Sequence, residues 1–296
     1  MNNRKKIVIT GASGFLGSHL AERLKDDEKY IVYALSSRPE ALKAKIGGAS
    51  VAFLHKDAFK ESGEFLRDAV VVHCAYPRNS TGTAIADGLK YIQGVFEAAV
   101  ENKAAAIINI SSQSVYSQQR TDTATEGTPV CLESPYAVGK YAVELMLESI
   151  CRGSSTVYTN LRMASLIGPG FDQRIVNRFA IKILNNEPVT VVRQDKQMGF
   201  LDVEDAVTAI LAVTEKSSIP LKRVYNVGNG KGYTVEAIYM AVAEALKERT
   251  EVSDPIIENG SDKSCTAVSY EALYADTGFI PVVDLKNSIE RIIAQM

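Results

Sequence analysis

Tyr136 and Lys140 are four residues apart, a spacing that places two side chains on one face of a helix. A tyrosine phenol has a pKa of about 10, and a nearby ammonium group favours its ionised form. We therefore expect Lys140 to lower the pKa of Tyr136. Such a phenol can take a proton from a hydroxyl group or return one to a carbonyl oxygen. Ser112 ends an apolar run and is expected to hydrogen-bond the same oxygen, with Ser114 as the alternative for that role.

An earlier stretch has the pattern of a dinucleotide-binding turn. Residues 7–9 predict a buried strand, three glycines follow at three-residue spacing, and residues 18–25 predict a helix. The helix N-terminus would offer unpaired N–H groups to phosphates. The alternative is a glycine-rich turn without a ligand. We expect this turn to hold a cofactor through Gly11 at the tight turn, Gly14 under the pyrophosphate, Gly17 at the helix–strand contact, and the intervening Ser13, Phe15 and Leu16.

The second expected strand, residues 30–35, ends where such a fold reads the adenosine ribose. An acidic residue there would favour NAD, whereas a nearby arginine can pair with a 2′-phosphate. The chain has no acid at this place and offers Ser36 and Arg38 instead. We therefore favour NADP over NAD, the alternative being that Arg38 is a solvated loop charge.

Two further strand ends complete the expected cofactor site. Residues 51–54 predict a strand, and Asp57 follows it either as an acceptor for the adenine amino group or as the cap of a helix beginning near Phe59. The apolar run 69–75 ends in Cys74 and Ala75, which are small enough to let a cofactor cross. Lys140 is also expected to hold the cofactor ribose.

Strands and helices alternate through the first half of the chain. We expect further helices over residues 84–102 and 134–150, with strands over 104–110 and 157–162. This alternation predicts an α/β fold, a Rossmann-type doubly wound parallel sheet. The second half lacks the rhythm, so we expect an NAD(P)-binding domain over 1–165 and a smaller mixed α/β substrate lobe over 166–296, partly interleaved with it.

Composition limits the classes of partner. The 296-residue chain has a formal net charge of −2, so it has no broad basic surface for nucleic acid. No apolar run approaches the ~20 residues of a membrane span. The basic residues 1–6 lead to only a short apolar stretch, so we expect no signal peptide and a cytoplasmic location. The four cysteines are far apart and the three histidines have no metal-ligand spacing, which predicts reduced thiols and no metal.

These motifs together resemble the extended short-chain dehydrogenase/reductases, and among them the NAD-dependent epimerase/dehydratase family that acts on nucleotide sugars. The resemblance covers most of the chain. It rests on Thr10-Gly11-x-x-Gly14-x-x-Gly17, His73-Cys74-Ala75, the serine turn ending at Val115-Tyr116, Tyr136-x-x-x-Lys140, Leu161-Arg162, Gly168-Pro169-Gly170, Phe200-Leu201-Asp202 and Tyr225-Asn226-Val227-Gly228.

The resemblance implies Tyr136 as the acid/base, Lys140 as its partner and ribose ligand, and Ser112 as the substrate-oxygen partner. It also implies hydride transfer between the nicotinamide and a sugar carbon, and a homodimer formed by helices 84–102 and 135–150. Dehydratases of the family carry an acidic pair after the catalytic hydroxyl residue, whereas this chain has Gln113 and Ser114. Dehydration is therefore disfavoured.

The expected substrate contacts depart from the family pattern. Met198-Gly199 stands where an arginine often grips the nucleotide diphosphate, and Ser165 stands where an asparagine often faces the phosphates. Arg174 and Arg178 are the candidates to replace that cation. The substrate-binding set is thus Ser112, Gln113, Ser114, Ser165, Arg174 and Arg178.

We accordingly expect an NAD(P)-dependent oxidoreductase that interconverts a secondary alcohol and a ketone on a nucleotide-linked or related sugar. The net reaction is 4-keto reduction or epimerisation. Two alternatives from other classes are a catalytically silent NADP(H) sensor and a structural dimer scaffold. The intact set of Ser112, Tyr136 and Lys140 argues against the sensor, because a sensor needs no acid/base.

Overall fold

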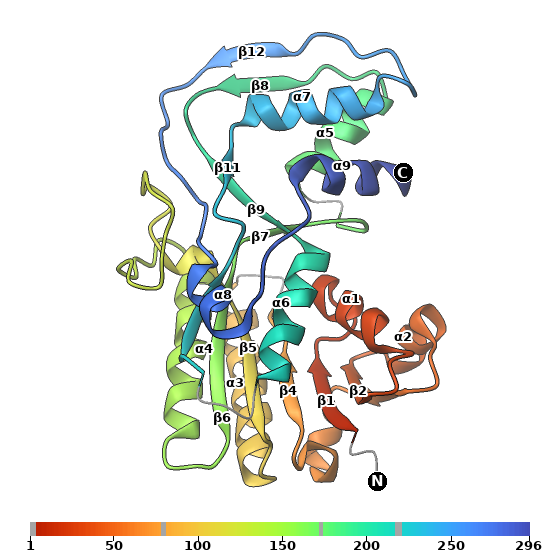
Figure 1. Cartoon of the computed structure of the whole chain (residues 1–296), viewed down its shortest axis with the longest axis vertical. Helices are drawn as coiled ribbons and strands as arrows, with labels where there is room; N and C mark the ends of the chain where they lie inside the picture. The colour runs from red at the N-terminus through yellow and green to blue at the C-terminus, as the bar shows by residue number, and fades with distance from the viewer. Residues whose placement is uncertain (1–3, 78–80, 172–173, 217–220) are drawn as a thin grey trace.

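A seven-stranded parallel sheet forms the centre of the larger lobe (Figure 1). The computed structural model describes residues 4–77, 81–171, 174–216 and 221–296; residues 1–3 of the basic opening segment lie outside it. In spatial order the strands are β10 (Val224–Val227), β6 (Val157–Met163), β5 (Ala106–Ser112), β4 (Val70–His73), β1 (Lys5–Thr10), β2 (Tyr30–Ser36) and β3 (Val51–His55). This confirms the predicted doubly wound parallel sheet.

Helices cover both faces of this sheet because its strands are apolar on both sides. On one face lie α1 (Phe15–Leu24), α2 (Pro39–Ile46), α6 (Val203–Glu215) and α8 (Glu271–Thr277). On the other face lie α3 (Gly82–Glu101) and α4 (Pro135–Cys151). The turns η1 (Ala58–Lys60), η2 (Glu64–Leu66) and η3 (Gln113–Val115) connect elements of this lobe.

The strand order reverses between β1 and β4, since β1 pairs with β2 on one side and with β4 on the other. Thr10 of β1 lies opposite His73 of β4, so the residues following both strands meet at one edge of the sheet. The reversal separates the connections that follow the two strands and leaves a crevice at their carboxyl ends. Gly11 and Cys74 begin those connections, which places the expected cofactor turn at this crevice.

A smaller lobe lies beyond the carboxyl ends of the strands and has its own apolar core (Figure 1). Its helices are α5 (Ile175–Leu184), α7 (Val235–Leu246) and α9 (Leu285–Ala294), beside the paired strands β8 (Thr190–Arg193) and β12 (Ile256–Asn259). A three-stranded sheet of β11 (Gly232–Tyr233), β9 (Met198–Asp202) and β7 (Ser165–Ile167) lies between the two lobes.

The chain returns to the larger lobe after residue 165, because β10 pairs with β6 and α6 packs against α1. The division of the chain at residue 165 remains a prediction. One local expectation is wrong. The helix expected near Phe59 is the single turn η1, and the side chain of its N-cap residue Asp57 makes no capping hydrogen bond. β12 was not predicted, because its four residues are exposed and carry no apolar alternation.

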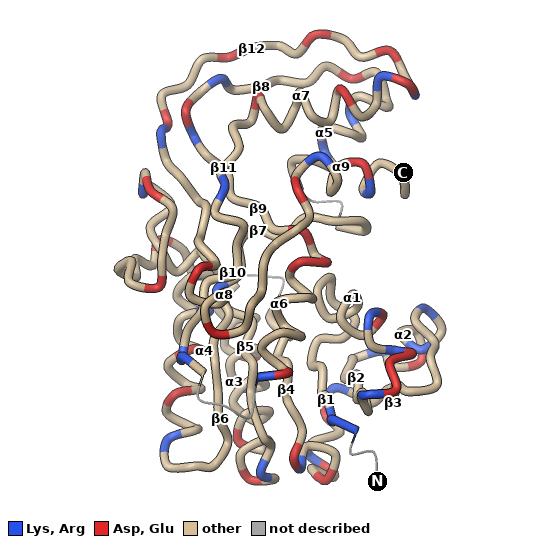
Figure 2. Tube along the Cα trace, in the orientation of Figure 1, with Lys and Arg blue, Asp and Glu red and all other residues tan. Residues whose placement is uncertain are grey.

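The structure also bears on the distribution of charge, membrane-spanning helices and metal sites. Figure 2 shows acidic and basic residues interspersed over both lobes. Within the described residues, no helix is both long and apolar enough to cross a membrane, and no group of His, Cys, Asp and Glu residues is arranged to hold a metal ion.

Candidate active site

The glycine turn joins β1 to α1 at the crevice. Gly11 has φ +68°, and a Cβ atom there would lie 2.7 Å from the backbone nitrogen of Ala75. A Cβ atom on Gly17 would overlap the carbonyl oxygen of Gly11, so helix and turn pack closer than any side chain allows. At Gly14 the added atom would meet only the Gly11 oxygen, at 3.1 Å, and otherwise open space.

This turn fits the phosphates of a dinucleotide. Gly14 is the N-cap of α1, and neither a side-chain cap nor an acidic residue serves the first turn of that helix. The N–H groups of that turn therefore keep their hydrogen-bonding capacity and their partial positive charge for an anion. Ser13 is exposed beside them, Leu16 is buried, and Phe15 stacks on Phe171 with 4.5 Å between ring centroids.

The expected ribose end lies after β2. Ser36 is buried, and its hydroxyl oxygen accepts a hydrogen bond from the backbone nitrogen of Arg38 at 3.0 Å. The Arg38 side chain is exposed, and no described residue forms a hydrogen bond or ion pair with its guanidinium group. Asp57 pairs with Lys60 at 2.7 Å, and this bond lowers the pKa of the carboxyl group. Its carboxylate is thus already engaged in the free protein.

Cys74 and Ala75 lie directly above the glycine turn, because the Cys74 nitrogen donates to the Thr10 oxygen at 3.1 Å. Burial raises the pKa of the Cys74 thiol to about 12. His73, one residue earlier, is 2% exposed and contacts Thr10 at 2.8 Å. Burial, and then the charge of Lys140, lower its pKa to about 3, so His73 is a neutral packed residue.

Tyr136, Lys140 and Ser112 come together at the carboxyl end of β5. Ser134 accepts a hydrogen bond from the Ala137 nitrogen and Pro135 occupies the first turn, so α4 begins where predicted. Tyr136 lies in that turn and keeps 36% of its surface exposed, and Ser112 lies close enough to the phenol to lower its pKa. Ser114 donates its hydroxyl to Ser112 at 3.0 Å. The geometry therefore places Ser112, rather than Ser114, next to the phenol.

Lys140 is buried one helical turn beyond Tyr136. Its Nζ donates to the Ile110 carbonyl oxygen at 2.7 Å and lies 4.3 Å from the centroid of the Tyr76 ring. Burial lowers the pKa of Lys140 to about 8. The expectation that Lys140 lowers the pKa of Tyr136 is wrong for the free protein. Burial raises that pKa, and the nearby Ser112 side chain and the charge of Arg174 act in the opposite direction.

A buried ion pair between Glu144 and Arg162 holds α4 against the sheet. Glu144, one turn after Lys140, accepts two hydrogen bonds from Arg162 of β6, at 3.0 and 2.7 Å. Ser111 and Tyr116 complete the network, and Tyr116 donates to Asn226 of β10 at 2.8 Å. Removing one partner of such a pair leaves an uncompensated buried charge, which costs about 3–5 kcal/mol. The network thus fixes α4 against the strands that carry Ser112.

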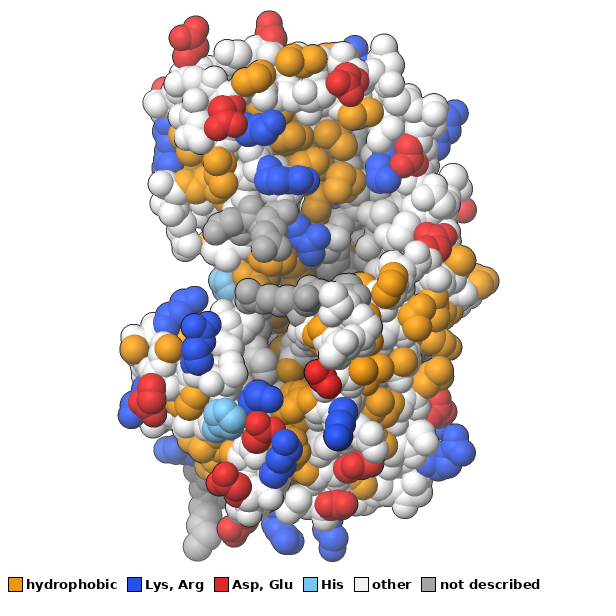
Figure 3. Space-filling model, turned by 180° about the vertical axis from the view of Figure 1, so that it is seen from behind, with side chains coloured by type: hydrophobic (Ala, Val, Ile, Leu, Met, Phe, Trp, Pro, Cys, Tyr) orange, Lys and Arg blue, Asp and Glu red, His pale blue; other side chains and the backbone are white. Residues whose placement is uncertain are grey.

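On the substrate side, the structure separates the expected residues. Arg174 occupies the N-cap position of α5 without a side-chain capping bond, and its guanidinium group lies 5.0 Å from the centroid of the Phe171 ring. It is close enough to Tyr136 for the two groups to shift each other's pKa. Its Nε is buried without a partner among the described residues. Arg178 lies one turn further along α5 and is exposed, and Ser165 begins β7. Figure 3 shows the surface hollowed between the two lobes.

Gln113 does not join Tyr136. It is 7% exposed, and its amide contacts Gln118 and Arg120, each at 3.3 Å. Those residues belong to the long loop that precedes α4. Gln113 therefore anchors this loop in the free protein.

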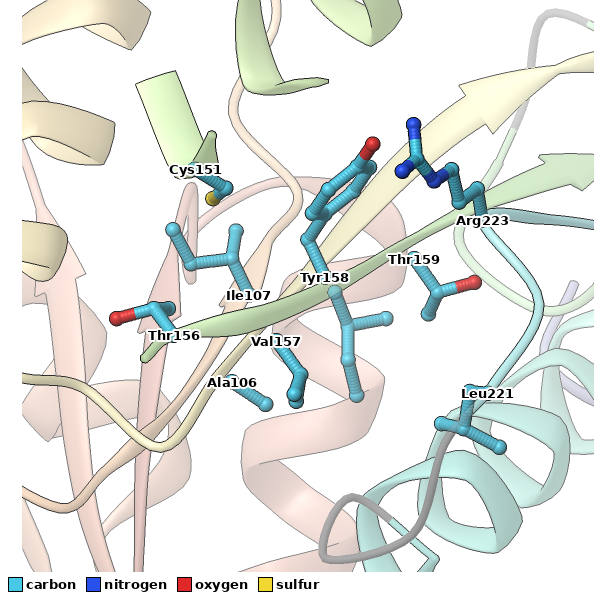
Figure 4. Close-up of a pocket in the computed structure, with 10 residues that line it drawn as sticks. Ala106, Ile107, Cys151, Thr156, Val157, Tyr158, Thr159, Leu221 and Arg223 are labelled. Atoms are coloured by element: carbon cyan, nitrogen blue, oxygen red, sulfur yellow. The ribbon is translucent and has the colours of Figure 1, made fainter. Parts of the chain in front are cut away.

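Two cavities lie away from this chemistry. One, of about 250 Å³, is lined by Ile107, Cys151, Tyr158 and Arg223 among others (Figure 4). It lies where β5 and β6 begin, whereas Ser112 lies where β5 ends. A shallower groove of about 450 Å³ lies between α3 and α4, lined by Leu89, Val138 and neighbouring residues. Neither contains Tyr136, Lys140 or the glycine turn.

Two site residues were missed by sequence reasoning. Tyr76 contacts both Lys140 and Tyr136, and its one signal was its place directly after His73-Cys74-Ala75. Phe171 covers Phe15 from the other lobe, and sequence gave no sign of that contact.

The sheet order and the glycine turn define a Rossmann-type dinucleotide-binding fold. A model of the NAD dependent epimerase/dehydratase family matches residues 7–228. The chain belongs to this family.

Relatives and solved structures agree with this assignment. A putative UDP-glucose 4-epimerase of Methanocaldococcus jannaschii is 25% identical, with 98% of each chain covered. The structure of UDP-glucose 4-epimerase from Thermotoga maritima with UDP-glucose matches with a TM-score of 0.81 at 20% identity, covering 98% of each chain. UDP-glucuronic acid 4-epimerase from Bacillus cereus in complex with NAD matches with a TM-score of 0.82 at 20% identity, covering 98% of this chain and 96% of that one.

Proposed function

We propose that the chain is an NAD(P)-dependent enzyme that interconverts a secondary alcohol and a ketone on a nucleotide-linked sugar. The observation that carries the proposal is that Ser112 lies close enough to the Tyr136 phenol to lower its pKa, with the buried Lys140 one turn further along the same helix. Family membership and the UDP-sugar epimerases among its relatives support the substrate class.

Each of these residues has a distinct role at the substrate oxygen. Tyr136 donates its proton to a carbonyl oxygen or takes the proton of a hydroxyl group, while Ser112 holds that oxygen in line. Lys140 binds the ribose hydroxyls, and its positive charge then assists ionisation of the phenol. When bound, the nicotinamide supplies or accepts the hydride at the sugar carbon.

The glycine turn and the end of β2 hold the cofactor. The N–H groups of Phe15 and Leu16, in the uncapped first turn of α1, would donate to the pyrophosphate. We favour NADP over NAD because Arg38 is exposed and without a partner among the described residues, next to the buried Ser36. The relatives with printed cofactors bind NAD, which makes this preference a point to be measured.

Arg174 is the proposed anion contact of the substrate. Its Nε is buried without a described partner, and its charge acts on Tyr136. A guanidinium group in this state favours a carboxylate or phosphate. Arg178 and Ser165 extend the same side of the cleft. Dehydration remains disfavoured, since Gln113 and Ser114 stand where the family's dehydratases have two acidic residues.

A homodimer formed through α3 and α4 is part of the proposal. Both helices line the shallow groove, and Val138 and Leu145 of α4 expose about half of their surface, at 50% and 51%. Packing these helices against the same helices of a second copy would bury both side chains.

The experiment is to purify the protein, identify the nucleotide that it retains, and incubate it with UDP-glucose or UDP-glucuronic acid. Tightly retained NAD⁺ and a 4-epimer product indicate an epimerase, because that cycle regenerates the cofactor. Exchangeable NADPH consumed with a 4-keto sugar indicates a reductase. Absence of binding to both nucleotides would contradict the proposal.

A further inference from the structure

Tyr76 lies in the connection after β4 and contacts both members of the catalytic pair. The Lys140 Nζ lies 4.3 Å from the centroid of the Tyr76 ring. The Tyr136 ring meets the Tyr76 ring edge to face, with 5.3 Å between centroids and 83° between planes. A single aromatic ring thus fixes the two side chains relative to each other.

The contact with Lys140 has a clear electrostatic use. The ammonium group is buried and has one described hydrogen-bond acceptor, the Ile110 carbonyl oxygen at 2.7 Å. A buried ammonium needs further compensation, and the negative face of an aromatic ring supplies it. The ring therefore keeps the lysine charge beside Tyr136 without pairing it to a carboxylate.

The Tyr76 hydroxyl is matched to a glycine of α4. It is buried without a described hydrogen-bond partner, and a methyl group on Gly139 would overlap it. A glycine inside a helix costs about 1 kcal/mol relative to alanine. Gly139 lies between Tyr136 and Lys140 in that helix, so its lack of a side chain lets Tyr76 reach both.

We propose that Tyr76 is a positioning residue for the reaction: its ring face holds the Lys140 ammonium and braces the Tyr136 ring, over a gap left by Gly139. The inference rests on the proposed function of Tyr136 and Lys140. Tyr76 acts through those residues and is assigned no contact with substrate.

The test uses Tyr76→Ala and Tyr76→Phe, with Tyr158→Ala as the matched control. Tyr158 is also half-buried against the same apolar cluster, and its hydroxyl also has no described partner. It lies at the opposite end of the strands, beside the cavity in Figure 4. Any general loss of packing should therefore affect both alanine variants alike.

The first readout is the titration of the Tyr136 phenol in the free protein, followed by NMR of ¹³Cζ-labelled tyrosine and assigned with Tyr136→Phe. Tyr76→Ala should lower the pKa of Tyr136, because water then reaches the phenol and removes part of the burial that raises this pKa. Tyr76→Phe should titrate like the wild type, since it keeps the ring. Tyr158→Ala should also leave this titration unchanged.

The second readout is turnover of the full enzyme with its cofactor. Tyr76→Ala should lower kcat about 10-fold to 100-fold with a smaller change in KM, because the acid/base is misplaced. Tyr76→Phe should stay within about twofold of wild type, as expected when the positioning ring is kept.

A third variant, Gly139→Ala, keeps the proposal testable if Tyr76→Ala does not fold. Gly139→Ala should displace the ring and lower both kcat and the pKa of Tyr136. Adding Tyr76→Phe should restore them, because the nearest remaining ring atom, Cζ, would lie 3.4 Å from the new methyl group.

Wild-type titration and turnover in both Tyr76→Ala and Gly139→Ala would overturn the inference, as would equal shifts in Tyr158→Ala. If the wild type turns over no nucleotide sugar, the proposed function fails instead. The Tyr136 titration still decides the role of Tyr76 in that case.

Discussion

The phenol of Tyr136 is buried enough for its pKa to be raised, yet 36% of the residue's surface is exposed. In the free protein it is therefore a neutral acid at physiological pH. This state is suited to giving a proton to a carbonyl oxygen. Taking a proton from a hydroxyl group requires the lysine charge to assist.

Tyr136→Phe should keep cofactor binding and lose turnover, because the ring stays and only the acidic hydroxyl is removed. The expected loss in kcat is about 10²–10⁴-fold, the usual range for an acid–base group. Nucleotide fluorescence titration and steady-state kinetics check the two parts. Undiminished kcat would exclude Tyr136 from the mechanism.

Lys140 should make stability depend on pH. Its pKa falls from 10.5 in the unfolded chain to about 8 in the fold, because burial disfavours the charge. Between these values the unfolded chain binds more protons than the folded chain, so Lys140 makes the free energy of unfolding rise with pH from about 8 to 10.5. Below about pH 8 the buried charge lowers the free energy of unfolding by a constant amount. The span is worth about 3 kcal/mol.

Urea unfolding of wild type and Lys140→Met at pH 7, 9 and 10 measures this effect as a difference, in which the other titrating groups cancel. The advantage of the methionine variant should be largest at pH 7 and shrink as pH rises. A difference that stays constant with pH would show that Lys140 does not carry a lowered pKa.

Arg38→Ala tests the cofactor preference. Loss of a charge-assisted bond to a 2′-phosphate should raise the Kd for NADPH about tenfold or more and leave the Kd for NADH nearly unchanged. Fluorescence titration with both nucleotides gives the ratio. Equal changes in the Kd values for NADPH and NADH would show that Arg38 is a solvent-exposed charge without a role in choosing the cofactor.

At the scale of elements, the N-terminus of α4 positions Tyr136, the proposed acid/base. Ser134→Ala should cost about 1 kcal/mol of stability. The matched variant Thr234→Ala removes the equivalent cap of α7 in the other lobe. Both should lower Tm by similar amounts in thermal unfolding, while only Ser134→Ala should lower kcat, because Tyr136 lies in the turn that it caps. Equal kcat values in Ser134→Ala and Thr234→Ala would show that the α4 cap does not contribute to turnover.

Local patterns predicted most elements of the larger lobe, because their apolar strands, glycine turn and helix caps are short-range signals. The Tyr136–Lys140 spacing belongs to this class. Contacts between distant segments could not be predicted, as for the Tyr76 ring on Lys140 or Phe171 on Phe15. They depend on strand order and helix register. β12 was missed for a related reason, since backbone pairing with β8, rather than burial, forms it.

At the scale of the whole molecule, the α3–α4 face should determine the oligomeric state. We expect light scattering to give a mass near twice that of the 32.2 kDa chain. Val138→Asp should reduce it to one chain, because burying an unpaired carboxylate costs several kcal/mol. Met240→Asp, on the equally exposed α7 surface, is the control and should remain dimeric. A monomeric wild type would contradict the proposal.

The late return of β10 to the large sheet also affects how the protein is made. During synthesis, β6 has an unpaired edge until residues 224–227 have left the ribosome. Until then the Tyr116 hydroxyl also lacks its hydrogen-bond acceptor on Asn226. A fragment that stops at residue 165 therefore keeps an unpaired edge along β6, the kind of edge that pairs with other chains. We expect such a fragment to aggregate, whereas one that extends through residue 228 can close the sheet. The seven-stranded sheet is thus complete only after more than three quarters of the 296-residue chain has been translated.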